Sequence, residues 1–318
     1  ILRHTGMDVR IGSLLPEISK ASTIDLPNGD SLILAPGQRK ENRLCLENFD
    51  PCAVLLNNDL SSGVPEILQN LEQTVIPPIH AGWATRRKSS FFTAYDSVAK
   101  EFSSLIGIDP WLINPYFGSC GKINFSEKKG EDCVAKNVDK ILLQIREKYK
   151  QYDVKEDPFV IVKADAGTYG MGVMTVKSGE EVRRLNRKQR NKMSVVKEGQ
   201  PVTKVLVQEG VYTFESINTA VAEPVIYMID RYVVGGFYRV HTGRGKDENL
   251  NAPGMHFVPL SFESSCLLPA NKTSRDYATN RFYAYSVIAR LALLTAALEL
   301  EKSANSFVDS APRTSREK

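Results

Sequence analysis

The chain lacks the features that define several large classes of protein. The longest apolar run, VIARLALLTAALEL near residue 290, is shorter than the roughly 20 residues that a membrane span needs and carries Arg290. Nothing near the start resembles a secretory signal. The five cysteines are scattered without a CxxC pair, which argues against a zinc site or a disulfide framework. We therefore expect a cytoplasmic protein with reduced thiols and no membrane association.

A strong excess of charge of one sign is also missing. The 318 residues include 41 Lys and Arg against 37 Asp and Glu, which leaves a formal net charge of +4. This small excess does not indicate nucleic-acid binding, but it suits a protein that handles phosphates or carboxylates. The basic stretch from Arg183 to Lys192 has no interleaved aromatic residues, so we interpret it as a solvated helix face.

Apolar periodicity predicts a mixed fold, α/β followed by α+β. Over residues 1–125, short apolar runs alternate with helical patterns, which indicates an α/β domain. Residues 126–260 hold helices and then mostly strands, which indicates a mainly antiparallel sheet. Residues 261–302 contain a strand end and a helix beginning near Asn280 that is apolar nearly all round, so we expect it to be buried. The tail, 303–318, is polar.

The strongest signal is the stretch VKADAGTYGMGV at residues 162–173. An apolar run rich in β-branched residues ends in Lys163, and Gly167, Gly170 and Gly172 follow it. Glycines let backbone N–H groups approach an anion closely, because no Cβ stands in the way. The stretch has no GK[ST] of a P-loop, and a strand follows it where a dinucleotide-binding turn would open a helix.

We interpret this stretch as a glycine-rich hairpin that forms a lid over phosphates, with a lysine on the incoming strand. The alternative is an ordinary glycine turn with a solvated lysine. Asp165, Thr168 and Tyr169 favour the lid, because they make the loop polar as well as flexible.

A second strand ends further along, in VTKVLVQEGVYTFE at residues 202–215. It stops at Gln208, Glu209, Gly210 and Val211, where a hinge between two lobes would offer backbone groups to the edge of an adenine ring. Glu215 lies a short reach beyond, which suits ribose hydroxyls. The alternative, a plain turn at the end of a strand, stays open.

A hairpin predicted at Asp230 and Arg231, and the polar loop after it, carry the candidate metal ligands. Mg²⁺ prefers oxygen ligands from carboxylate and amide side chains. Asp247 and Asn249 would lie on one side of an extended segment, because side chains alternate there. Arg239 and Arg244 suit the neutralisation of a transferring phosphoryl group. A polar surface loop is the alternative, and the competing metal candidates are Asp230, Asp247, Glu248, Asn249 and Asn251.

A basic turn precedes a helix that we expect to begin at about Ser89. Arg86, Arg87 and Lys88 gather there, and cations at such a place can hold a carboxylate or a phosphate. A solvated basic turn explains the pattern equally well.

Four longer motifs resemble one family. NNDLSSGVP, GWATRRKSSFF, KADAGTYGMGV and ENLNAPGMHFVPL are similar to the proteobacterial type of glutamate–cysteine ligase. The order of lysine strand, glycine lid, hinge and metal-and-arginine segment resembles the ATP-grasp superfamily. The resemblance spans residues 7–302. It implies ATP-dependent joining of the γ-carboxyl of glutamate to the amine of cysteine, the first step of glutathione synthesis, with ATP and Mg²⁺ as cofactors.

The resemblance also implies roles for individual residues. Lys88 and Lys163 become contacts to nucleotide phosphates, the Gly167–Gly172 loop the lid, and Gln208 to Val211 the adenine hinge. From their charge and position, and not from the resemblance, we assign Arg86, Arg87 and Arg244 as substrate contacts and Lys163 and Arg239 as catalytic residues. One departure stands out, because no Glu-x-Asn metal pair is found after residue 260.

The alternatives are another ATP-grasp carboxylate–amine ligase, similar to glutathione synthetase, and a non-catalytic nucleotide-binding protein. We expect small-molecule partners, namely glutamate, cysteine and ATP, and neither nucleic acid nor a membrane. Assembly into a homo-oligomer stays open.

Overall fold

The chain divides into two compact units, Ile1–Ala84 and Thr85–Lys318. The computed structural model describes residues 5–310 except 28, 58–59, 61–62, 82–85, 167–169, 196–200 and 261–279, and for 304–310 it describes the backbone alone. The division lies earlier than residue 125, where we expected the first domain to end, because the helix and strand that follow Thr85 belong with the second unit. The four predicted segments therefore remain predictions.

The first unit is built from short strands. Its three-stranded sheet has the order β1–β3–β2, and two further pairs join β4 to β5 and β6 to β7. Its described helical elements are the 3₁₀ turns η2 (Glu66–Leu68) and η3 (Ile79–Ala81). The strands are Ile11–Ser13, Ser22–Asp25, Ser31–Pro36, Gln38–Lys40, Arg43–Cys45, Ala53–Leu55 and Thr74–Ile76 for β1 to β7.

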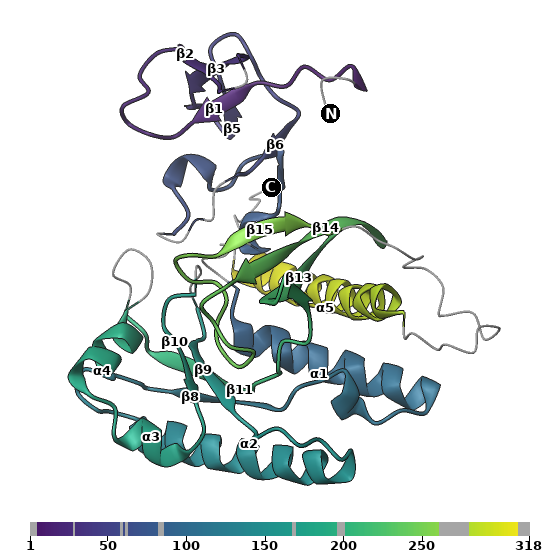
Figure 1. The fold of residues 1–318 in the computed structure, drawn as a ribbon. Coiled ribbons are helices and arrows are strands. Elements are labelled where there is room, and N and C mark those ends of the chain that lie inside the picture. Colours follow the sequence, from purple (N-terminus) through teal and green to yellow (C-terminus); the bar gives the residue numbers. More distant parts are fainter. Residues whose placement is uncertain are drawn as a thin grey trace, which may run out of the picture. The chain divides into compact units, whose positions relative to one another are not determined.

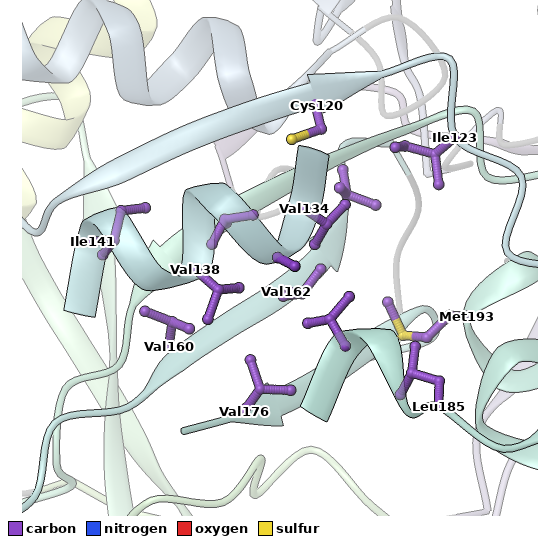
Figure 2. Packing of buried hydrophobic residues seen from close by; sticks show 14 of the residues in the cluster. Cys120, Ile123, Val134, Val138, Ile141, Val160, Val162, Val176, Leu185 and Met193 are labelled. Carbon is purple, nitrogen blue, oxygen red and sulfur yellow. The ribbon is translucent and has the colours of Figure 1, made fainter. Parts of the chain in front are cut away.

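The second unit is organised around a four-stranded antiparallel sheet of order β10–β9–β11–β8. These strands are Val173–Val176, Val160–Ala164, Lys204–Glu209 and Phe117–Gly121. Helix α2 (Glu131–Gln151) covers one face, because Val134, Val138 and Ile141 recur at helical spacing. Figure 2 shows these side chains against Val160 and Val162 of β9. Two short helices, α3 (Gly179–Arg183) and α4 (Arg187–Ser194), follow β10.

A second antiparallel sheet has the order β12–β13–β14–β15, formed by Ser216–Ile217, Ala220–Ile229, Tyr232–His241 and His256–Pro259. The hairpin predicted at Asp230 is confirmed, because Ile229 pairs with Tyr232 and Asp230 has φ +51°. Phe282 of α5 (Arg281–Ser310) packs on this sheet against Ala222 and Val240.

Helix α1 (Lys88–Ile106) begins where the sequence predicted a helix and lies beside α5 (Figure 1). Tyr95, Val98 and Ala99 pack against Leu291. The helix ends at Gly107 in the left-handed region, φ +69°, where its N–H bonds to the Ser103 carbonyl.

The expectation that the last helix is buried all round is wrong. Leu293 and Leu294 of α5 are 38% and 52% exposed, although other positions of the helix pack on α1 and β13. Within the described residues, Arg281–Ser303 is the single helical segment that is long and apolar enough to cross a membrane, a weak indication that soluble proteins also give. The fold is thus mixed α/β with several sheets.

Candidate active site

Lys163 and Lys88 come from two different elements to one place on the central sheet. Lys163 lies on β9 and points to the face opposite α2, because Val162 and Ala164 on either side of it belong to the α2 core. Lys88 opens α1, and its Nζ donates to the Ala164 carbonyl oxygen at 2.9 Å. Lys163 Nζ lies 5.2 Å from the ring centre of Phe92, one turn along α1. The two predicted phosphate contacts are therefore neighbours.

Burial destabilises the charge on both lysines. Burial first, and the like charge of Lys88 second, lower the pKa of Lys163 to about 8. Burial also lowers the pKa of Lys88; Asp165 opposes this shift and Arg87 adds to it. An anion that binds between two partly buried ammonium groups stabilises their charge. Lowered lysine pKa values of this kind therefore mark candidate binding sites.

Asp165 fixes the position of this lysine pair. Its carboxylate is 2% exposed and accepts hydrogen bonds from Ser89 N–H at 2.7 Å and from Ser89 Oγ at 2.9 Å. Lys204 Nζ lies 3.4 Å from Oδ2, and the Asp165 carbonyl accepts Lys88 N–H at 3.0 Å. The carboxylate thus caps the first turn of α1 from outside the helix. Sequence spacing missed this role, because Ser89 and Asp165 lie 76 positions apart.

The predicted glycine-rich hairpin is confirmed, and it joins β9 to β10. Val173 pairs with Lys163, and Ala164 N–H donates to the Gly172 carbonyl at 2.8 Å. Gly170 and Gly172 have φ +69° and +62°, a region that favours glycine. Gly167, Thr168 and Tyr169 lie outside the described residues.

The hairpin lies against the loop that carries the candidate metal ligands. A Cβ on Gly170 would stand 3.0 Å from Asn249 Nδ2 and 3.0 Å from the Asn251 carbonyl oxygen. The same loop reaches β10, where Thr175 Oγ1 donates to the Asp247 carbonyl at 3.5 Å. The glycine turn and the polar loop are therefore in contact.

Glu209 and Gly210, two of the hinge candidates at the end of β11, are both held by contacts within the protein. The buried Glu209 carboxylate accepts Trp111 Nε1–H at 3.0 Å and Tyr116 N–H at 2.9 Å, and burial raises its pKa. This side chain anchors the strand end. The Gly210 N–H donates to the Phe159 carbonyl, and a Cβ on Gly210 would lie 2.0 Å from the Phe159 ring, so the strand end permits only glycine there.

Gln208 differs, because its Oε1 is buried and has no hydrogen-bond partner among the described residues. Gln208 pairs with Ile161, two residues from Lys163, so its side chain shares the Lys163 face of the sheet. A buried acceptor without a partner is costly unless a ligand or water satisfies it. Val211 follows at the surface, 68% exposed.

Glu215 and Arg239 are held by protein partners. The Glu215 carboxylate accepts a hydrogen bond from Tyr285 and lies 3.2 Å from Arg281 Nη1. The carboxylate predicted to bind ribose is therefore already paired with two residues of α5. Arg239 pairs with Glu223 on the neighbouring strand, yet its Nε is buried without a partner in the described part of the chain. Both assignments stay predictions.

The three substrate candidates also differ in their surroundings. Arg86 is paired with Glu299 of α5 and lies over the Phe91 ring. Arg244 is paired with Glu248 at 2.7 Å. Arg87 precedes α1 and is exposed. Arg87 and Arg244 are thus both exposed, and Arg244 is engaged by Glu248.

The five metal candidates do not form one cluster. Asp230 lies at the tip of the β13–β14 hairpin, and the polar loop leaves the other end of β14 at His241, roughly 30 Å away along the strand. Asp247 is 3.1 Å from Lys177 Nζ. The Gly245 N–H first and Arg244 second hold the pKa of Glu248 below its usual range.

The geometry expected for Asp247 and Asn249 is wrong, because residues 242–254 form turns and bends in place of an extended segment. His241 fixes this loop: its Nδ1 accepts Gly243 N–H and its Nε2 bonds to the Pro253 carbonyl, both at 3.0 Å. No three His, Cys, Asp or Glu residues of the described chain gather in metal-binding geometry. The predicted residues therefore do not fit a magnesium site made by protein alone, and we derive no step from one.

Asp165→Asn should weaken the start of α1 and lower stability. The neutral amide would leave the buried Ser89 donors without their charged acceptor and the exposed Lys204 without its ion-pair partner, at a cost of about 1–3 kcal/mol. Urea unfolding measures the loss. Glu101→Gln, on the exposed side of the same helix, is the matched control. Equal unfolding midpoints for the two variants would contradict the role given to Asp165.

Comparisons with known proteins show which family the chain is similar to. The family model for glutamate-cysteine ligase (GshA) matches residues 1–300. A protein from Methylobacillus flagellatus KT, provisionally assigned as a gamma-glutamylcysteine synthetase, has 64% sequence identity and a TM-score of 0.84 over 95% of this chain and 71% of its own. The D-alanyl-alanine synthetase A of Vibrio cholerae O1 biovar eltor str. N16961 aligns over 81% and 70% with 12% identity and a TM-score of 0.36, which carries no argument. No curated protein matches.

The family match covers nearly the whole chain, and the lysine pair and glycine hairpin lie within it. The resemblance to glutamate–cysteine ligase found in the sequence is confirmed, and so is the enzyme class. The chain belongs to the glutamate–cysteine ligase family and is a ligase.

Proposed function

We propose that the chain joins the γ-carboxyl of glutamate to the amine of cysteine through an acyl phosphate, with ATP bound over the Lys163 face of the central sheet. ATP is a substrate of this reaction. The observation that carries the site is the meeting of Lys88 and Lys163 beside the glycine hairpin. An ATP-grasp-like arrangement, with the nucleotide between two antiparallel sheets, is part of this proposal.

The chemistry explains why cations are needed. A free carboxylate is a poor electrophile, so an oxygen of the γ-carboxylate attacks the γ-phosphorus of ATP and the bond to ADP breaks. The cysteine amine then attacks the carbonyl carbon, loses a proton, and phosphate leaves. The protein has to position the reactants and neutralise phosphoryl charge, and no covalent nucleophile is required. Lys88 and Lys163 supply that charge from two sides.

Neighbouring groups suit the rest of a nucleotide. The unpaired Gln208 Oε1 is an acceptor for the exocyclic amine of adenine, and it shares the face of Lys163. The turn at Gly170 brings backbone groups toward phosphates and rests on the Asn249–Asn251 loop. Closure of this hairpin would exclude water from the acyl phosphate, which hydrolyses readily.

Other parts of the proposal rest on the sequence alone. They are the requirement for magnesium, the cytoplasmic location, the absence of nucleic-acid and membrane partners, and the open question of a homo-oligomer. Of the five metal candidates, Asn249 and Asn251 are the two that the structure brings to the glycine turn. They are the first residues to vary in a test of metal dependence.

A coupled ADP-release assay tests the reaction. ADP should form only when glutamate and cysteine are both present, because the acyl phosphate turns over only when an amine displaces it. Omitting either amino acid is the control. Release with a different acid–amine pair would point to another carboxylate–amine ligase, and nucleotide binding without release under any pair would point to a non-catalytic protein. Either result would contradict the proposal.

Lys163 should make nucleotide binding depend on pH. Phosphates favour the ammonium form, whose pKa in the free protein is about 8, so affinity for ATP should fall as the pH rises through 8. In Lys163→Arg the charge persists, and this fall should disappear. Lys163→Ala should lose about 100-fold in turnover while remaining folded.

Calorimetric titration with ATP in the absence of both amino acids measures the pH dependence, so ionisation of the cysteine substrate does not enter. The same pH-dependent fall in affinity in Lys163→Arg, or near-normal turnover of Lys163→Ala, would show that Lys163 does not contact the phosphates.

Gly170→Ala tests the hairpin. A Cβ there meets Asn249 and Asn251 at 3.0 Å with φ +69°, so the turn should shift and turnover should fall by more than about 10-fold. Gly107→Ala is closely matched, because it has the same φ of +69° and nothing within 4 Å of the added Cβ. It carries the same backbone strain and should retain turnover. Equal activity in the two variants would show that the hairpin does not act in catalysis.

A further inference from the structure

Two cysteines outside the ligase site lie in contact where α2 packs on the central sheet. Cys120 is on β8 and is 2% exposed, whereas Cys133 is in the first turn of α2 and is exposed. Their Sγ atoms are 2.7 Å apart. A disulfide bond is about 2.05 Å long, so the two sulfurs need to approach by only about 0.7 Å to be bonded.

The surroundings hold Cys120 in place and leave Cys133 open. Asn137, one turn beyond Cys133, donates from Nδ2 to Cys120 Sγ at 2.9 Å. Burial first, and the contact with Cys133 second, raise the pKa of Cys120 to about 12. Figure 2 shows Cys120 at the edge of the core, beside the first turns of α2 near Val134. Attack on an incoming reagent therefore begins at Cys133, because the buried thiol keeps its proton and is not reached by solvent.

We propose that Cys133 and Cys120 form a site of thiol–disulfide exchange that takes low-molecular-weight disulfides and closes to an intramolecular disulfide. The Cys133 thiolate attacks one sulfur of the small disulfide, which forms a mixed disulfide and releases one thiol. Cys120 then loses its proton and attacks Cys133 Sγ, which forms the Sγ–Sγ bond and releases the second thiol. Two protein thiols are oxidised and one small disulfide is reduced to two thiols.

The bond would tie the first turn of α2 to the edge of the sheet that carries Lys163. Val205 pairs with Cys120 on one side and with Ala164 on the other, so the sulfur pair lies two strands from the carbonyl that binds Lys88. A cross-link between a helix and the strand before it restricts the unfolded chain. The disulfide should therefore raise the melting temperature by several degrees.

Peptide mapping of the full chain tests the site. The protein is incubated with oxidised glutathione, free thiols are blocked with iodoacetamide, and the digest is read by mass spectrometry without reduction. We expect a cross-linked peptide that joins Cys120 to Cys133, and a higher melting temperature for the treated protein. Peptides containing Cys45, Cys52 and Cys266 should remain alkylated or carry separate glutathione adducts.

Three variants separate the two thiols. In Cys120→Ser, the mixed disulfide at Cys133 should accumulate, because the second attack is lost. In Cys133→Ser, which changes an exposed residue, Cys120 should stay a thiol. Cys52→Ser, a second exposed cysteine, should leave the cross-link intact. In the chain without substitutions, a stable glutathione adduct on Cys133, or alkylation of both Cys120 and Cys133 after treatment with oxidised glutathione, would overturn the proposal.

Discussion

The site depends on one buried carboxylate, Asp165, placed where β9 ends and α1 begins. Its carboxylate accepts the Ser89 N–H in the first turn of the helix and balances the positive charge of Lys204. Its backbone carbonyl accepts a hydrogen bond from Lys88 N–H. Together with the packing of Phe92 on Phe117, this contact places Lys88 at the carbonyl beside Lys163. Two lysines that lie far apart in sequence become one binding feature because a single anion neutralises their surroundings.

The positive charge at this face exceeds what Asp165 offsets, and the excess has a chemical use. Burial and mutual repulsion lower the pKa of Lys163 to about 8, which means that the free protein holds its ammonium group at a cost. In the proposed mode of binding, a triphosphate would relieve that cost. The glycine hairpin lies at the end of the same strand, and its Gly170 rests on the Asn249–Asn251 loop.

Local patterns predicted much of this fold, and long-range contacts account for what they missed. The strand ending in Lys163, the hairpin at Asp230 and the start of α1 follow from apolar periodicity and turn residues. The solvent-facing side of α5 could not be predicted, because an apolar composition does not show which side finds a partner. The polar loop after His241 was expected to be extended, but a histidine that bonds to Gly243 and Pro253 folds it into turns.

The most direct test of the account is a crystal structure of the full chain with a non-hydrolysable ATP analogue. The account predicts that the phosphates lie within hydrogen-bonding distance of Lys88 Nζ and Lys163 Nζ, under the backbone of the glycine hairpin, with adenine near Gln208. A nucleotide bound elsewhere, with Lys163 still facing Phe92 and both ammonium groups free of phosphate, would contradict it.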